Sequence, residues 1–148
     1  MDRIALFPGS FDPMTTGHLA LLRKAMPLFD RIIVAIGVNS AKKEFLPLAE
    51  RISRIQKATA DMPNIKTASY SGTTIDFCHK TGAKFILRGV RNNADFEYER
   101  TIADINRLLD SDIETVILIS EPQYAAISST MVRELASLGK DVSKFVIQ

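Results

Sequence analysis

Short apolar runs recur along the chain, and several are almost continuously apolar rather than alternating with polar residues. Continuous runs of this length are typical of parallel strands that are covered on both faces of a sheet. The pattern predicts strands at residues 4–7, 32–36, 65–70, 85–87 and 116–119.

Between these runs, apolar residues return every three or four positions, which is the spacing of a helix. In 48–62, for example, Ile52, Ile55, Ala58 and Met62 form one stripe. The spacing predicts helices at 19–26, 48–62, 75–80, 93–109 and 128–138, and a last helical turn within 141–148. Because strands and helices alternate, we expect an α/β fold with a doubly wound parallel sheet of about five strands, in a single domain over 1–148.

Composition narrows the class of protein. The 148 residues are 46% hydrophobic and 24% charged, and the net charge is only +2. The concentrated basic stripe of a nucleic-acid binder is missing from the sequence. The single cysteine, Cys78, excludes an intramolecular disulfide and fits a reducing compartment. The apolar runs are too short to span a bilayer, and we expect no signal peptide. We therefore expect a cytoplasmic protein without nucleic-acid or membrane partners.

The segment 9–18, Gly-Ser-Phe-Asp-Pro-Met-Thr-Thr-Gly-His, carries the strongest chemical signal. It lies where the first expected strand gives way to the first helix. In open α/β sheets, ligands bind at the carboxyl ends of strands, and a helix start suits phosphate. Gly17 allows a ligand close to the backbone, and His18 adds a side-chain donor. Asp12 is expected to fix this loop rather than to touch a substrate.

Three further segments follow expected strands: 39–43, 88–91 and 124–130. Together they predict an anion site on one edge of the sheet. Arg88 and Arg91 suit a bidentate grip on phosphate, whereas lysine acts as a movable point charge. A buried strand has no evident structural need to end in two arginines. The first turn after Ser128 contains no acidic residue, which leaves that helix start open to an anion.

The spacing Thr15-x-Gly17-His18 matches the T/HxGH signature of the nucleotidyltransferase superfamily. Alone it leaves cytidylyltransferases and nicotinate mononucleotide adenylyltransferases open. Further matching pieces narrow the choice: 8–13, 42–43, 88–91 (Arg-Gly-Val-Arg), 95–99 (Asp-Phe-Glu-Tyr-Glu) and 127–130. With these pieces, the chain resembles the bacterial-type phosphopantetheine adenylyltransferases over nearly its whole length.

The resemblance implies a Rossmann-like nucleotidyltransferase fold and a defined reaction. The adenylyl group of ATP would pass to 4′-phosphopantetheine, giving dephospho-coenzyme A and pyrophosphate, with Mg²⁺ as cofactor and a homohexameric assembly. Two alternatives stay open. One is a cytidylyltransferase acting on a small phosphorylated alcohol, and the other is a nucleotide-sensing module that has lost turnover.

The resemblance also implies roles for individual residues. His18, Lys42 and Arg91 would be catalytic, and no metal ligand is implied. Ser10, Lys42, Thr74 and Arg88 would bind phosphopantetheine, although Thr73-Thr74 replaces the aliphatic residues of many members. The ATP site would comprise Ser10, Phe11, His18, Gly89, Val90, Arg91, Glu99, Tyr124, Ala125, Ala126, Ile127, Ser128, Ser129 and Thr130.

Some of these residues also have simple structural interpretations. Ser128 to Thr130 can serve as a helix cap, which is compatible with phosphate binding. Glu99 can be an ordinary exposed helix charge. Two other polar or reactive residues lack a motif: His79 is expected at the surface, and Cys78 is expected to fill apolar space.

Overall fold

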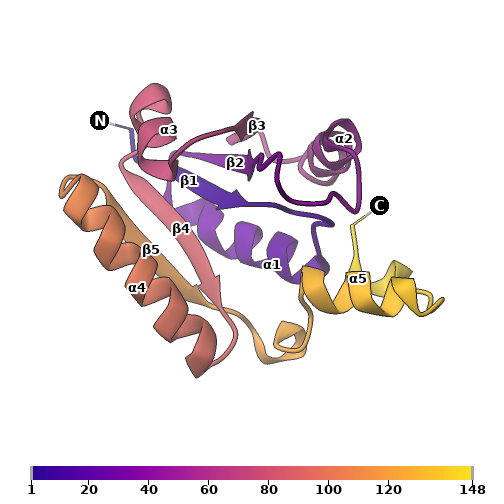
Figure 1. Cartoon of the computed structure of the whole chain (residues 1–148). Helices are drawn as coiled ribbons and strands as arrows, with labels where there is room; N and C mark the ends of the chain where they lie inside the picture. The colour runs from indigo at the N-terminus through magenta and orange to yellow at the C-terminus, as the bar shows by residue number, and fades with distance from the viewer. Residues whose placement is uncertain (1, 148) are drawn as a thin grey trace.

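Five parallel strands form one sheet in the computed structural model, which describes residues 2–147 (Figure 1). The strands are β1 (Ile4–Gly9), β2 (Arg31–Gly37), β3 (Ile65–Tyr70), β4 (Phe85–Val90) and β5 (Glu114–Ile119). Their order across the sheet is β3-β2-β1-β4-β5. The five predicted strands and the doubly wound α/β fold are confirmed.

The helices are α1 (Thr16–Ala25), α2 (Leu48–Ala58), α3 (Thr74–Thr81), α4 (Asn93–Leu109) and α5 (Ser129–Ser137), with short 3₁₀ turns at Met26–Leu28, Pro122–Tyr124 and Ser143–Phe145. The bounds of α4 agree with the prediction. The expected helix at 48–62 is too long, because α2 ends at Ala58 and a turn follows. The segment 88–91 was expected to follow a strand, but β4 continues through Val90 and only Arg91 lies beyond it.

The core has two layers, one on each face of the sheet. On one face, Phe7 of β1 belongs to the same buried cluster as Leu22 of α1 and Ile55 of α2. On the other face, Leu6 clusters with Ile75 and Cys78 of α3. Neighbouring residues of β1 thus point to opposite faces, as strand geometry requires. Cys78 fills apolar space as expected, and its thiol is fully buried.

The central strands separate towards their carboxyl ends. β1 is in register with β2 from Ile4 to Gly9, over its whole length. Its register with β4 covers only Ala5 and Leu6, opposite Phe85 and Ile86. The strand order reverses between β1 and β4, which is the position where doubly wound sheets bind ligands. The architecture therefore opens a space beside the segment that carries the Gly17-His18 motif.

The C-terminal segment returns to this region. Val146 is buried and forms an isolated antiparallel bridge with Thr15, and Ile147 N–H donates to Met14 O. The expected helical turn is present as the 3₁₀ turn Ser143–Phe145, with Phe145 half-buried. The docking of this segment supports the loop that precedes α1.

Helix α4 lies at the front of the sheet beside β4 and β5 (Figure 1). Its apolar stripe points outward in a single copy of the chain. Tyr98, Ile105 and Leu109 are 64%, 52% and 59% exposed, and the helix buries only Glu99 fully. The stripe therefore does not belong to the core of one chain.

Gly82 ends α3 in the left-handed conformation, with φ of +78°, and no atom lies within 4 Å of the position a Cβ would take. Any cost of adding a side chain here therefore comes from the backbone. We expect Gly82→Ala to lower the free energy of unfolding by about 1–2 kcal/mol. Gly82→Asn should cost less, since asparagine tolerates this conformation better. Urea unfolding of the three proteins checks this, and equal stability of Gly82→Ala and the wild type would contradict it.

Across residues 2–147, no helix combines the length and the apolar character needed to cross a membrane.

Candidate active site

Two neighbouring cavities open beside the carboxyl ends of β1 and β4. The first has a volume of about 350 Å³, and it lies between the β1 end, the start of α1, α4 and the start of α5. The second has a volume of about 210 Å³ and extends towards α3 and the middle of α4. The two cavities share the residues Pro8, Gly9, Ser10, Arg88 and Glu99. They can hold two ligands that meet at Ser10 and Arg88.

Helix α1 begins with a capping box built around Thr15. The Thr15 side chain accepts from His18 N–H, and in return Thr15 N–H donates to His18 Nδ1 at 3.0 Å. In most capping boxes a glutamate or glutamine side chain accepts from the backbone N–H of the N-cap residue. Here the imidazole of His18 takes that place. The arrangement uses Nδ1 as an acceptor. In the neutral ring, the proton therefore lies on Nε2, which is available as a donor.

The surroundings of His18 keep the imidazole neutral. Its ring packs edge-on against Phe11 at 5.2 Å and lies 6.5 Å from Phe7. Burial lowers the pKa of His18 to about 4, with a further contribution from the positive charges of Arg88 and Arg91. Phe11 adopts a φ of +46°, which is uncommon for a residue with a side chain and often occurs at functional sites. A neutral donor is thus held in a fixed direction.

This pKa gives a pH prediction. The imidazole of His18 should titrate near pH 4 rather than at its ordinary 6.5. The unfolded chain takes up that proton first, so the contribution of His18 to stability should fall as the pH drops from about 6.5 to about 4. Bound polyphosphate should raise the pKa, because its negative charge favours the imidazolium. A two-dimensional NMR titration, assigned with a His18→Asn variant, measures the midpoint. A midpoint near 6.5 without ligand would contradict the proposed environment.

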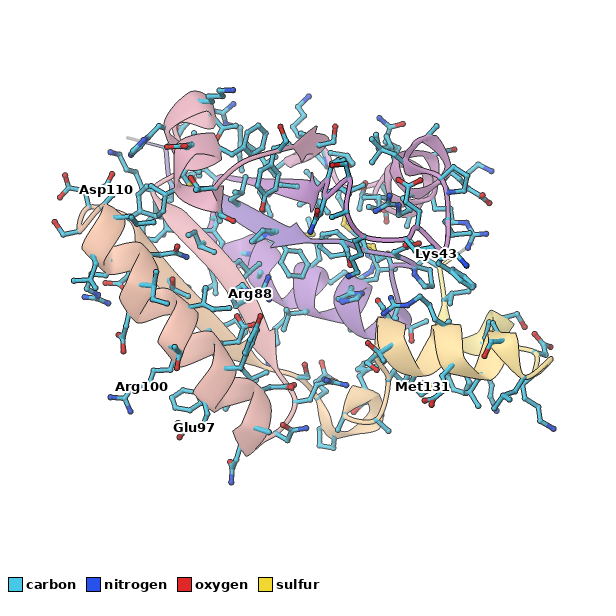
Figure 2. The ribbon with its side chains drawn as sticks, in the orientation of Figure 1. Lys43, Arg88, Glu97, Arg100, Asp110 and Met131 are labelled. Carbon is cyan, nitrogen blue, oxygen red and sulfur yellow. The ribbon has the colours of Figure 1, made fainter. Side chains whose placement is uncertain are left out.

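Arg88 lies at the boundary of the two cavities, between β4 and α4 (Figure 2). Its Nε and Nη2 form a two-point ion pair with Glu99 of α4, and Nη1 donates to Pro8 O at 2.6 Å. Glu99 is only 6% exposed, so the interpretation as an ordinary exposed helix charge is wrong. Because Glu99 and Pro8 O hold the guanidinium in place, Arg88 can meet an anion with little loss of side-chain freedom.

Arg91 is paired in the same way. It follows β4 and donates from Nε to Asp95 at 2.9 Å, while its backbone N–H bonds to the same carboxylate. Asp95 and Glu99 lie four residues apart and so share the face of α4 that meets the end of β4. The two arginines therefore also have a structural role at the end of β4, because each pairs with an acid of α4. Both are nevertheless part of the cavity lining and about two-thirds buried.

The start of α5 closes the larger cavity with hydroxyl groups. Ser128 is the N-cap, and its side chain accepts from Met131 N–H. Ser129 donates to Pro13 O at 2.7 Å, which ties α5 to the motif loop. The first turns of α1 and α5 contain no acidic residue. The helix starts therefore keep the positive electrostatic character that favours an anion.

Comparison with known proteins identifies the group to which this arrangement belongs. Residues 6–135 match the family model described as cytidylyltransferase-like. The phosphopantetheine adenylyltransferase of Phocaeicola vulgatus is 48% identical over 97% of this chain and 95% of that protein. The enzyme of the same name from Flavobacterium psychrophilum is 49% identical over the same shares. The chain belongs to the phosphopantetheine adenylyltransferase family.

Solved structures agree with this fold at much lower sequence identity. A candidate nicotinate-nucleotide adenylyltransferase of Vibrio parahaemolyticus superposes with a TM-score of 0.74 at 19% identity, over all of this chain and 88% of that one. A bifunctional NMN adenylyltransferase/ADP ribose pyrophosphatase of Francisella tularensis gives 0.72 at 17%, over 99% of this chain and 45% of that one. The phosphopantetheine adenylyltransferase family thus shares its architecture with distant adenylyltransferases.

Most residues that the family resemblance assigned to substrates do line the cavities. The larger cavity includes ten of the expected ATP residues: Ser10, Phe11, His18, Gly89, Arg91, Glu99, Tyr124, Ile127, Ser128 and Ser129. The smaller one includes three expected phosphopantetheine residues, Ser10, Thr74 and Arg88. Thr74 is bonded to the hydroxyl of Tyr70 at 2.9 Å. The two cavities thus bring these residues together.

Several expected residues of the phosphopantetheine adenylyltransferase pattern lie outside the cavity lining. Val90 is buried within β4, and Thr130 accepts from Arg133 on α5. Lys42 is exposed on the loop between β2 and α2. The remaining two, Ala125 and Ala126, are in the turn before α5 and do not contribute to either lining.

The sequence interpretation missed Asp95, Tyr98 and Ser120 as parts of the larger cavity and Tyr70 as part of the smaller one. The four-residue spacing of Asp95 and Glu99 was a usable signal for two acids facing β4. Ser120 carries no comparable signal, since it is a lone serine after β5.

Proposed function

We propose that this protein transfers the adenylyl group of ATP to 4′-phosphopantetheine, giving dephospho-coenzyme A and pyrophosphate. The observation that carries this proposal is the pair of cavities that meet at Ser10 and Arg88, with the donor His18 in the larger one. Such a site can hold a nucleotide in one space and a phosphorylated acceptor in the other. The relatives reported above are named for this activity, and they align with nearly the whole chain.

The chemistry needs positioning rather than a general base. A phosphate monoester has a second pKa near 6 and is largely dianionic at neutral pH, so it is already a nucleophile. What it needs is alignment with the α-phosphorus of ATP and neutralisation of the charge that builds up there. Arg88 and Ser10, which line both cavities, align the acceptor phosphate. Lys42, exposed on the loop between β2 and α2, reaches this phosphate as a mobile charge. His18 donates from Nε2 to the α-phosphate as its charge grows.

The leaving group takes the other end of the larger cavity. Arg91 and the start of α5, at Ser128 and Ser129, hold the β- and γ-phosphates that leave as pyrophosphate. Backbone N–H groups at the helix start and a charged guanidinium are the donors that phosphate prefers. The uncharged imidazole of His18 and the guanidinium of Arg91 thus act on different phosphates of one nucleotide.

We further propose that Mg²⁺ arrives with ATP and is held by phosphate oxygens and water. The carboxylates that line the larger cavity, Asp95 and Glu99, are already paired with Arg91 and Arg88. Among residues 2–147, no group of three or more His, Cys, Asp or Glu side chains is arranged to hold a metal ion. The donor set therefore suits a metal carried by the nucleotide, whose role is to neutralise the triphosphate.

Pyrophosphate release tests the activity. The purified protein is supplied with ATP or CTP, each with 4′-phosphopantetheine or a small phosphorylated alcohol. We expect turnover with the pair ATP and 4′-phosphopantetheine, and dephospho-coenzyme A as the product by mass spectrometry. Turnover with CTP alone would favour the cytidylyltransferase alternative, and nucleotide binding without single-turnover chemistry would favour the sensing module.

A homohexamer is proposed from the family resemblance, and the outward apolar stripe of α4 gives it a physical basis. Tyr98, Ile105 and Leu109 expose apolar area that a second copy of the chain can cover. Light scattering should give six times the 16.4 kDa mass of one chain. Ile105→Glu, a variant on this stripe outside both cavity linings, should reduce the mass. A monomeric wild type at micromolar concentration would refute the assembly.

We also propose a cytoplasmic location and small-molecule partners only. The one cysteine, Cys78, is free and buried, which suits a reducing compartment. Arg88 and Arg91 lie in the lining of a cavity rather than on an open basic surface, which favours a small phosphate ligand over a nucleic-acid backbone.

A further inference from the structure

Asp12 is a buried carboxylate that the proposed chemistry does not use. It lies in the motif loop and is 5% exposed. Its two oxygens accept from the backbone N–H groups of Phe45 and Leu46, both at 2.7 Å. These two residues belong to the loop between β2 and α2 that carries Lys42. One side chain thus joins the motif loop to a segment more than thirty residues away in sequence.

Arg51, near the start of α2, joins the same two segments from the other side. It is also 5% exposed. Its guanidinium donates to Leu46 O at 3.0 Å, to Ser10 O at 2.9 Å and to Glu44 Oε1 at 2.8 Å. Its Nε lies 4.0 Å from Asp12 Oδ1, which balances the two buried charges. The three bonds use the forked donor geometry that is particular to arginine.

The motif loop is held from its far side by α5. Arg133 donates to Asp12 O at 2.9 Å, and Ser129 donates to Pro13 O at 2.7 Å. The backbone around Asp12 therefore has fixed partners independent of its side chain. The loop 39–47 differs, because the N–H groups of Ala41 and Lys42 bond locally, to Asn39. Asp12 and Arg51 are thus the structural link between the Lys42 loop and the floor of the site at Ser10.

Apolar side chains could hold two segments together at lower desolvation cost than a buried ion pair. A pair of charges with five directed hydrogen bonds instead fixes where each backbone lies. We propose that Asp12 and Arg51 form a buried clamp that positions Ser10 and the Lys42 loop towards the acceptor phosphate. This inference rests on the proposed function, because Lys42 and Ser10 are assigned to that phosphate there. Both residues are positioning residues and touch no substrate.

Asp12→Asn tests the clamp with little change in side-chain size. An amide replaces one of the two carboxylate oxygens with an NH₂ group, so one of the two N–H groups loses its own acceptor atom. We expect kcat/KM for 4′-phosphopantetheine to fall roughly tenfold to a hundredfold, the effect of losing charge-assisted hydrogen bonds. The KM for ATP should change little. Amide hydrogen exchange should accelerate at Phe45 and Leu46, while amides of β1 and β2 remain protected.

Matched variants separate positioning from folding. Arg51→Met should reproduce the acceptor defect. Arg54→Met should behave as the wild type, because Arg54 lies one turn along α2 and pairs with exposed Glu50. A double-mutant cycle joins Asp12→Asn with Lys42→Ala. If the clamp acts through Lys42, the loss caused by Asp12→Asn should shrink in the Lys42→Ala background.

Two results would overturn the clamp: equal losses for ATP and 4′-phosphopantetheine, or additive losses in the cycle together with unchanged exchange at Phe45 and Leu46. Calorimetry of 4′-phosphopantetheine binding keeps this separate from the proposed function. A wild type that binds 4′-phosphopantetheine without turnover would refute the proposed reaction, while weaker binding by Asp12→Asn than by Arg54→Met would still support the clamp.

Discussion

His18→Ala is expected to lower kcat by roughly 10²–10³-fold, the usual cost of removing one donor to a developing negative charge. The structure gives the reason. Thr15 N–H occupies Nδ1, burial keeps the ring neutral, and Nε2 is left to donate into the larger cavity. The bond strengthens as charge builds on the α-phosphate, so the loss should appear in kcat, with a smaller change in ATP affinity.

Initial rates of dephospho-coenzyme A formation give kcat, and calorimetry gives the ATP affinity. Together the two measurements check this result. His79→Ala is the control, because His79 lies on the surface as expected and bonds to Asp110 away from both cavities. A near-normal kcat for His18→Ala would remove His18 from the mechanism. A loss confined to ATP affinity would make it a binding residue only.

Replacing Arg88 and replacing Arg91 are expected to reduce kcat/KM for different substrates. Arg88→Ala should mainly reduce kcat/KM for 4′-phosphopantetheine, and Arg91→Ala should mainly reduce kcat/KM for ATP. Each charged contact with phosphate in a partly buried site contributes about 1.5–3 kcal/mol, or roughly one to two decades in rate. Lys42→Ala should resemble Arg88→Ala, but more of its loss should appear in kcat, because a mobile lysine contacts the phosphate mainly in the transition state. Initial rates with each substrate varied separately measure the split.

Arg88→Ala has a second effect, because it leaves the buried carboxylate of Glu99 without its partner. An unpaired buried charge is strongly destabilising. The double variant Arg88→Ala/Glu99→Gln removes this charge and should recover stability without recovering use of the acceptor. If Arg91→Ala raised only the KM of the acceptor, the assignment of the two phosphate positions would be wrong.

Much of the fold could be predicted because hydrophobic periodicity reports it directly. The runs at 4–7 and 32–36 are buried on both faces, and their continuous apolar character follows from that. Strand ends were less predictable, because Arg88 and Gly89 continue the β4 ladder although neither is a strongly apolar residue. Hydrogen-bond register, rather than side-chain character, decides where β4 stops. The end of α2 was missed for a similar reason, since apolar Met62 is buried from a turn outside the helix.

The candidate site was predictable where a local motif carries it. Thr15 and His18 form a capping box three residues apart, with Gly17 between them, so sequence spacing specifies their geometry. Partnerships across the fold were not predictable in this way. The pairing of Arg88 with Glu99 and the contact of Asp12 with Phe45 depend on how separate elements pack. Spacing along one segment contains no record of such contacts. Asp12 was expected to fix its own loop, whereas its side chain accepts from the loop between β2 and α2 and so joins the two loops.

The central claim is a single, direct displacement at the α-phosphorus, carried out by positioned phosphates without an enzyme nucleophile. Its most direct test uses ATP with a chiral α-thiophosphate as the adenylyl donor to 4′-phosphopantetheine. We expect the dephospho-coenzyme A analogue to form with inversion of configuration at that phosphorus, because the acceptor phosphate attacks in line with the leaving pyrophosphate. Retention of configuration would require two displacements through a covalent intermediate and would contradict the mechanism.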